Sequence, residues 1–159
     1  MSVADNLLEV RGRIAAACKD AGRDAVAVEL VAVSKKQLDD RIDEALAAGQ
    51  RVFGENRVQE AQGRWGERRG EHVDLKLHLI GPLQSNKVKD AVALFDVIEV
   101  VDREKLARGL AKEMTAQDRH LPCFIQVNTG EEDQKAGVLP LALSAFYDFC
   151  VGECGLTII

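Results

Sequence analysis

The chain has 159 residues and carries 21 Lys+Arg against 26 Asp+Glu, which gives a formal net charge of −5. This acidic balance argues against nonspecific attraction to nucleic acid or another polyanion. No apolar stretch approaches the ~20 residues that cross a bilayer, and the first residues lack the basic start and apolar centre of a secretory signal. We therefore expect a cytoplasmic protein with neither a membrane nor a nucleic-acid partner.

The cysteines and histidines show no pattern typical of a redox or metal site. There is no Cys-x-x-Cys pair, three of the four cysteines lie in apolar surroundings, and no histidine stands four residues from another histidine or from a cysteine. We expect buried free thiols in a reducing compartment and no metal ion. The residues are Cys18, Cys123, Cys150 and Cys154, and His72, His78 and His120.

The first third of the chain predicts a helix, a buried strand and a second helix. Apolar residues at helical spacing predict a helix over 3–21 that ends at Gly22. The run 28–33, Val-Glu-Leu-Val-Ala-Val, is rich in β-branched residues and predicts a strand covered on both faces. A helix over 39–48 follows and ends at Gly49.

The rest of the chain repeats this alternation of short strands and helices. Residues 66–74 are charged and contain glycine, so we expect a surface loop there. Strict alternation with short connections implies parallel strands joined by right-handed crossovers. The further predicted strands are 51–53, 75–80, 97–101, 122–127 and 155–159, and the further predicted helices are 58–68, 86–95, 103–115 and 141–150.

Five strand and helix pairs and the start of a sixth strand predict an α/β fold, either an open doubly wound sheet or a (β/α)8 barrel. A barrel of this kind takes ~250 residues and rarely fewer than ~200. We therefore expect residues 1–159 to form a single domain whose C-terminal part is missing from the numbered sequence.

Polar side chains gather where the predicted strands end. Since the C-terminal ends of parallel strands share one edge of the sheet, we expect these side chains to surround a small polar ligand. Lys35 follows the first strand, and a desolvated lysine in such a pocket reacts with aldehydes to form a Schiff base. The alternatives for Lys35 are an exposed cation and an ion-pair partner. The residues at this edge are Ser34, Lys35, Glu55, Asn56, His78, Gly81, Gln84, Asn86, Lys87, Glu99, Asp102, Asn128, Glu132 and Lys135.

The segment 81–86, Gly-Pro-Leu-Gln-Ser-Asn, is a candidate for binding a phosphate group. Phosphate sites use backbone amides in glycine-containing loops or at helix N-termini. The same residues also suit an ordinary helix cap, and their spacing leaves both interpretations open.

Four segments resemble a known family. They are 32–35, Ala-Val-Ser-Lys; 53–60, Phe-Gly-Glu-Asn-Arg-Val-Gln-Glu; 78–87, His-Leu-Ile-Gly-Pro-Leu-Gln-Ser-Asn-Lys; and 127–137, Val-Asn-Thr-Gly-Glu-Glu-Asp-Gln-Lys-Ala-Gly. In this order, and over nearly the whole chain, they resemble the YggS/PROSC family of pyridoxal phosphate homeostasis proteins. The resemblance implies a (β/α)8 TIM barrel similar to the N-terminal domain of alanine racemase, of which this chain covers about the first five to six strands.

The resemblance also implies a cofactor, pyridoxal 5′-phosphate (PLP), held as a Schiff base on Lys35. Asn56 matches the family's asparagine beside the cofactor, and His78 is expected near the cofactor ring. The family segments that hold the phosphate group would lie beyond Ile159.

Strand parity agrees with the choice of Lys35 over its neighbour. Lys35 continues the face of Val31 and Val33, whereas Lys36 would turn to the opposite side of the strand.

The leading hypothesis is a monomeric, non-catalytic PLP-binding protein for vitamin B6 homeostasis, with apo PLP-dependent enzymes as partners. The runner-up is a PLP-dependent amino-acid racemase, which needs a second acid or base on the opposite cofactor face. The only tyrosine, Tyr147, falls in a predicted helix away from the strand ends. A Schiff-base aldolase would account for Lys35 but not for the other matched segments.

Overall fold

A computed structural model describes residues 2–159 and is centred on a sheet of five parallel strands. The strands lie in the order β1-β2-β3-β4-β5, which repeats their order in the chain. A doubly wound sheet reverses this order at a switch point, whereas a (β/α)8 barrel keeps it. The α/β prediction is confirmed, and the barrel is the arrangement that the topology favours. The strands are β1 Ala32–Val33, β2 Val52–Glu55, β3 Lys76–Leu79, β4 Val97–Val101 and β5 Cys123–Ile125.

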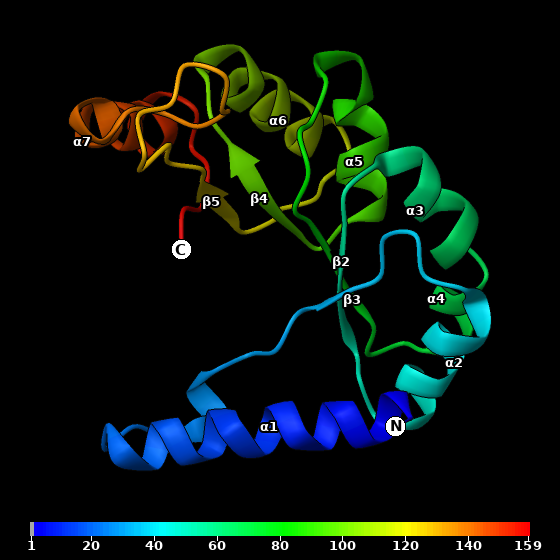
Figure 1. Ribbon diagram of the computed structural model, residues 1–159. Coiled ribbons are helices and arrows are strands. Elements are labelled where there is room, and N and C mark those ends of the chain that lie inside the picture. Colours follow the sequence, from blue (N-terminus) through cyan, green and yellow to red (C-terminus); the bar gives the residue numbers. More distant parts are fainter. Residues whose placement is uncertain (1) are drawn as a thin grey trace.

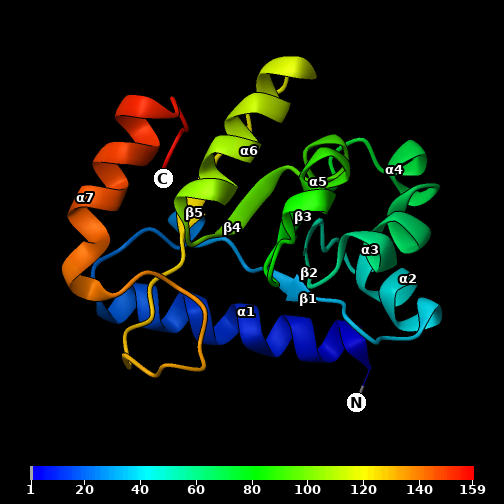
Figure 2. The same ribbon diagram turned by 90° about the horizontal axis from the view of Figure 1, so that it is seen from above.

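The helices follow one another around the outside of the curved sheet, from α2 to α7 (Figures 1 and 2). The long helix α1 packs against α2 and against the turn η1. Among the described residues, no helix is long and apolar enough to span a bilayer. The helices are α1 Val3–Asp20, α2 Asp39–Ala47, α3 Val58–Trp65, α4 Arg68–Glu71, α5 Val88–Leu94, α6 Glu104–Ala116 and α7 Leu143–Asp148; the shorter turns are η1 Ala25–Ala27, η2 Ser85–Lys87, η3 Pro140–Ala142 and η4 Phe149–Glu153.

The two faces of the sheet differ in burial because side chains alternate along each strand. On the outer face, Phe53 meets Trp65 of α3 with ring centroids 4.6 Å apart, and Leu79 is fully buried. On the inner face, Val33 is 47% exposed and Phe124 is 38% exposed. The hydrophobic core of the described residues therefore lies between the sheet and its outer helices.

The first strand is shorter than the predicted strand 28–33, since only Ala32–Val33 pairs with β2. Hydrogen bonds from the Gln50 side chain account for the shorter strand. Gln50 Nε2 donates to the carbonyl oxygens of Leu30 at 2.8 Å and of Val52 at 2.7 Å. A side-chain amide thus joins the two segments where a backbone ladder was predicted.

The predicted loop 66–74 contains the short helix α4, so that prediction is wrong in part. Arg69 reaches from α4 to Asp96, with Nη2 2.6 Å from Oδ2. This ion pair joins residues that are far apart in sequence, and local composition does not reveal it.

The predicted strand 155–159 is reduced to an isolated parallel bridge between Cys123 and Ile158. The predicted helix 141–150 is divided into η3, α7 and the π-helical turn η4. The alternation of the chain was therefore predicted better than its element boundaries.

Candidate functional site

Lys35 lies directly beyond the carboxyl end of β1, in a tight turn. The N–H of Gln37 donates to the carbonyl oxygen of Ser34 at 3.1 Å, and Lys36 between them has φ of 57°. Lys35 is exposed, and its amine takes part in no hydrogen bond or ion pair with residues 2–159. Of the interpretations that the sequence left open, the structure shows an exposed amine; Lys35 is not desolvated, and an ion pair with the described part of the chain is not observed.

A buried carboxylate anchors this turn. Oε1 of Glu55 accepts hydrogen bonds from Ser34 Oγ at 2.7 Å, from Arg64 Nη1 at 2.7 Å and from Trp65 Nε1 at 3.0 Å. The Glu55 side chain is fully buried, and the Arg64 side chain is 15% exposed. The ends of β1 and β2 are thereby fixed to α3.

Asn56 reaches the same edge of the sheet as Lys35. Val33 pairs with Gly54 in the β1–β2 register, so Lys35 and Asn56 each stand two residues beyond a paired position. Asn56 is half-buried. The structure thus brings two of the three predicted cofactor-binding residues to neighbouring strand ends.

Gly81 permits the loop after β3 to pass against Asn56. A Cβ at position 81 would lie 2.3 Å from the carbonyl oxygen of Asn56 and 2.6 Å from its Cα. Backbone atoms cannot move aside as a flexible side chain does, so any residue larger than glycine would displace one of the two loops.

A cavity of about 530 Å³ opens between the loops that follow β2 and β3. Its charged side chains, Arg57 and Lys87, are both cations, and the others are amides or apolar. Arg103 holds one wall in place by donating to the carbonyl oxygen of Leu83 at 2.8 Å. The segment 81–86 therefore borders a basic cavity. The cavity is lined by Asn56, Arg57, Val58, Gln59, Pro82, Leu83, Gln84 and Lys87.

His78 lies within β3, at the level of Gly54 and therefore below Asn56. It is 5% exposed, and its Nδ1 is 2.6 Å from Oε1 of Glu99 on β4. Its Nε2 has no hydrogen-bond partner among the described residues, and the nearest carboxylate oxygen, from Glu29, is 3.7 Å away. The structure pairs His78 with Glu99, and its place beside a cofactor ring stays a prediction.

The loop after β5 is held by hydrogen bonds and an ion pair between its own residues. Asn128 Nδ2 donates to the carbonyl oxygen of Glu132 at 2.9 Å, and Lys135 pairs with the Glu132 carboxylate at 2.7 Å. These contacts stay within the loop and do not link its residues to Lys35.

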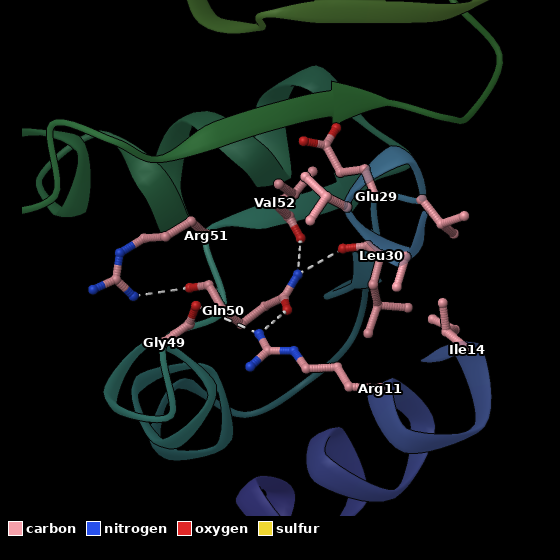
Figure 3. A pocket seen from close by; sticks show the side chains of 11 residues that line it. Arg11, Ile14, Glu29, Leu30, Gly49, Gln50, Arg51 and Val52 are labelled. Carbon is pink, nitrogen blue, oxygen red and sulfur yellow. Dashed lines mark hydrogen bonds between the residues drawn. The ribbon is translucent and has the colours of Figure 1, made fainter. Parts of the chain in front are cut away.

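A second cavity, of about 410 Å³, lies near the amino-terminal end of β2 (Figure 3). Arg11 reaches into it from α1 and donates to Oε1 of Gln50 at 2.8 Å, while the Gln50 amide nitrogen binds the carbonyls of Leu30 and Val52. Both the oxygen and the nitrogen of the Gln50 amide are hydrogen-bonded within the protein. We therefore interpret this cavity as a structural contact that holds the segment before β1 against α1 and β2.

The importance of Glu55 and α3 was missed by the sequence analysis. From the sequence, Glu55 is expected only as one of the residues at the strand ends. The available signal was an acidic residue at the end of the apolar segment Val52-Phe53-Gly54, because a buried carboxylate requires partners.

Comparison with known protein families matches residues 10–159 to the alanine racemase N-terminal domain. The chain belongs to this family. It is 41% identical over 146 residues to the pyridoxal phosphate homeostasis protein of Pseudomonas aeruginosa, covering 91% of this chain and 62% of that protein. It is 39% identical over 137 residues to the protein of that name from Escherichia coli, covering 86% of this chain and 58% of that protein. The predicted resemblance is confirmed, and the chain spans about 60% of the length of these relatives.

Solved structures agree with this assignment. PipY of Synechococcus elongatus without PLP has a TM-score of 0.82 at 37% identity, covering 95% of this chain and 65% of that chain. PipY with PLP bound has a TM-score of 0.75 at 38% identity, and the match covers 92% of this chain and 62% of that chain. A histidine racemase from Leuconostoc mesenteroides, 14% identical with a TM-score of 0.66 over 99% of this chain and 39% of that chain, shares the fold. The predicted similarity to the alanine racemase barrel is confirmed.

Proposed function

We propose that this protein binds PLP through a Schiff base on Lys35 and serves intracellular PLP homeostasis without catalysing a reaction. The observation that carries the proposal is Lys35 itself, an exposed amine without an ion-pair partner among residues 2–159, held at the carboxyl end of β1 in an anchored turn. The likeness to pyridoxal phosphate homeostasis proteins and to PLP-bound PipY supports this choice of ligand.

The residues around Lys35 suit such a ligand. Asn56 offers an amide at the next strand end and lines the basic cavity, where the charge of Lys87 complements a phosphate ester; the neighbouring Arg57 is paired with Glu60 at 3.0 Å. We propose Lys35 and Asn56 as cofactor-binding residues, with His78 on the inner face of the sheet as a third.

PLP supplies an aldehyde that an amine can capture reversibly. With PLP bound, Lys35 would supply the amine whose condensation with this aldehyde forms a C=N bond, the carbonyl oxygen leaving as water with the two amine protons. The role of the chain is to present this amine and hold the ligand.

We also propose that binding is non-catalytic, that the protein acts as a single monomeric domain in the cytoplasm, and that apo PLP-dependent enzymes receive the cofactor. Racemisation requires a second acid or base on the opposite face of the cofactor. Tyr147, the sole tyrosine, lies on the outer helix α7 and is 45% exposed.

The test is the visible absorbance of the PLP-loaded protein. The band of a lysine Schiff base should be present in the unsubstituted protein, absent in Lys35→Ala and retained in Lys36→Ala. Loss of the band in Lys36→Ala with retention in Lys35→Ala would overturn the assignment.

A further inference from the structure

We propose that Glu55 is a positioning residue that determines which of two adjacent lysines, Lys35 or Lys36, captures the PLP aldehyde. The inference rests on the proposed function and adds to it a residue that does not touch the ligand. Two neighbouring amines of the same chemistry need a structural reason for one to be selected, and the Glu55 contacts provide it.

The first step is the convergence of three donors on one buried oxygen. Ser34, Arg64 and Trp65 all donate to Oε1 of Glu55, and Oε2 has no partner among the described residues. Ser34 immediately precedes the lysine pair. Its backbone N–H donates to the carbonyl oxygen of Gly54 at 3.1 Å, so Ser34 is joined to β2 by both its side chain and its backbone.

The second step is that the far side of the lysine pair is bound to the same group. Arg64, which pairs with Glu55, also donates from Nη2 to the carbonyl oxygen of Gln37 at 3.3 Å. The residues before and after Lys35 and Lys36 are therefore both tied to the Glu55–Arg64 pair. Rotation of the turn about the strand axis requires breaking one of these ties.

The third step is the backbone of Lys36, whose φ is 57°. A side chain with a Cβ pays a steric cost in this left-handed region, and such conformations persist where surrounding contacts enforce them. Without the ties from Glu55 and Arg64, only the hydrogen bond from the Gln37 N–H to the Ser34 carbonyl would hold Lys36 at positive φ, and relaxation toward negative φ would become easier. That relaxation would change the directions in which both amines leave the turn.

The experiment compares the two lysines within one molecule. The protein is incubated with PLP and treated with borohydride, which delivers hydride to the carbon of the C=N bond while water protonates the nitrogen. Proteolysis and tandem mass spectrometry then give the ratio of label on Lys35 to label on Lys36. The exposed lysines of α6, Lys105 and Lys112, give the level of nonspecific labelling.

The informative variants are Glu55→Ala, which removes the shared acceptor, and Ser34→Ala, which removes one donor and leaves the buried carboxylate paired. Glu55→Gln is the conservative variant, because its amide oxygen can still accept from Ser34. Asp96→Asn is the matched control. Asp96 also holds a partly buried arginine and a backbone N–H, but it precedes β4, away from the lysine turn.

We expect the Lys35:Lys36 ratio to fall about tenfold in Glu55→Ala, to fall in Ser34→Ala, to recover in Glu55→Gln and to stay unchanged in Asp96→Asn. An unchanged ratio in Ser34→Ala, or an equal fall in Asp96→Asn, would overturn the role of Glu55.

If Glu55→Ala does not fold, the ratio in Ser34→Ala tests the inference in its place. If neither lysine of the unsubstituted protein exceeds the Lys105 level, the proposed function fails, and the inference fails with it. Selective labelling of Lys35 in every variant would contradict the role of Glu55 while leaving the proposed function intact.

Discussion

The hydroxyl of Ser34 donates to Oε1 of Glu55 at 2.7 Å, and this bond joins the end of one strand to the end of its neighbour. Because Glu55 also binds Arg64 and Trp65, the outer helix α3 is part of the support of the lysine turn. The reactive amine proposed for this protein is exposed, whereas Ser34, Glu55 and Trp65 beneath the turn are all buried.

Removing Arg64 should destabilise the fold strongly. Arg64→Met leaves the Glu55 carboxylate buried and without a charged partner, and the free energy of unfolding should fall by about 3–5 kcal/mol. Urea denaturation measures this difference. Arg57→Met is the control, since the Arg57–Glu60 pair at the start of α3 is exposed and should contribute only about 0–1 kcal/mol. Equal losses in the two variants would contradict the importance assigned to the buried pair.

Gly81→Ala should disturb the site as well as the fold. The added Cβ would meet the Asn56 backbone, and overpacking of this kind costs about 1–3 kcal/mol. PLP affinity, measured by absorbance titration, should fall because Asn56 is displaced. Gly12→Ala provides the comparison, because Gly12 lies within α1 and, apart from its chain neighbours and its own helix backbone, no atom lies within 4 Å of the new Cβ. Gly12→Ala should be neutral or stabilising by up to about 1 kcal/mol, and PLP affinity unaffected by Gly81→Ala would count against the proposed contact.

Stability should decrease in alkaline solution through buried thiols. Burial raises the pKa of Cys123 from 9.0 to about 12 and that of Cys150 from 9.0 to about 11. The folded protein keeps these thiol protons, which the unfolded chain releases above pH 9 or so, and the free energy of unfolding therefore falls as the pH rises through this range. Urea denaturation at increasing pH measures the slope, which should be smaller in Cys123→Ala than in the unsubstituted protein. Equal slopes in Cys123→Ala and the unsubstituted protein would show that Cys123 does not contribute to the loss of stability at high pH.

The PLP-loaded protein should not exchange the α-proton of amino acids. Incubation with alanine and other common amino acids in deuterated water, followed by NMR, should show no incorporation of deuterium. Exchange that disappears in Lys35→Ala would favour the racemase alternative over simple binding.

The sequence predicts well those features that depend on local pattern. Apolar runs such as 97–101 became strands, and the alternation of strands and helices gave the correct parallel topology. Lys35 and Asn56 could be placed at neighbouring strand ends because the carboxyl ends of parallel strands share an edge.

The sequence predicts poorly those features that depend on contacts between distant residues. Gln50 binds Leu30 in the part of the predicted strand that precedes the paired Ala32–Val33, and Arg69 stabilises α4 through Asp96, 27 residues away. The pairing of His78 with Glu99 depends in the same way on the neighbouring positions of β3 and β4. Side-chain partners of this kind follow from the assembled sheet, so propensity and spacing alone could not identify them.

A crystal structure of the PLP-loaded protein would test the central claim most directly. We predict continuous electron density from Nζ of Lys35 to the cofactor, with Asn56 beside it and the Ser34–Glu55 hydrogen bond intact. Continuous density from Lys36, or cofactor bound away from the carboxyl end of β1, would contradict the account.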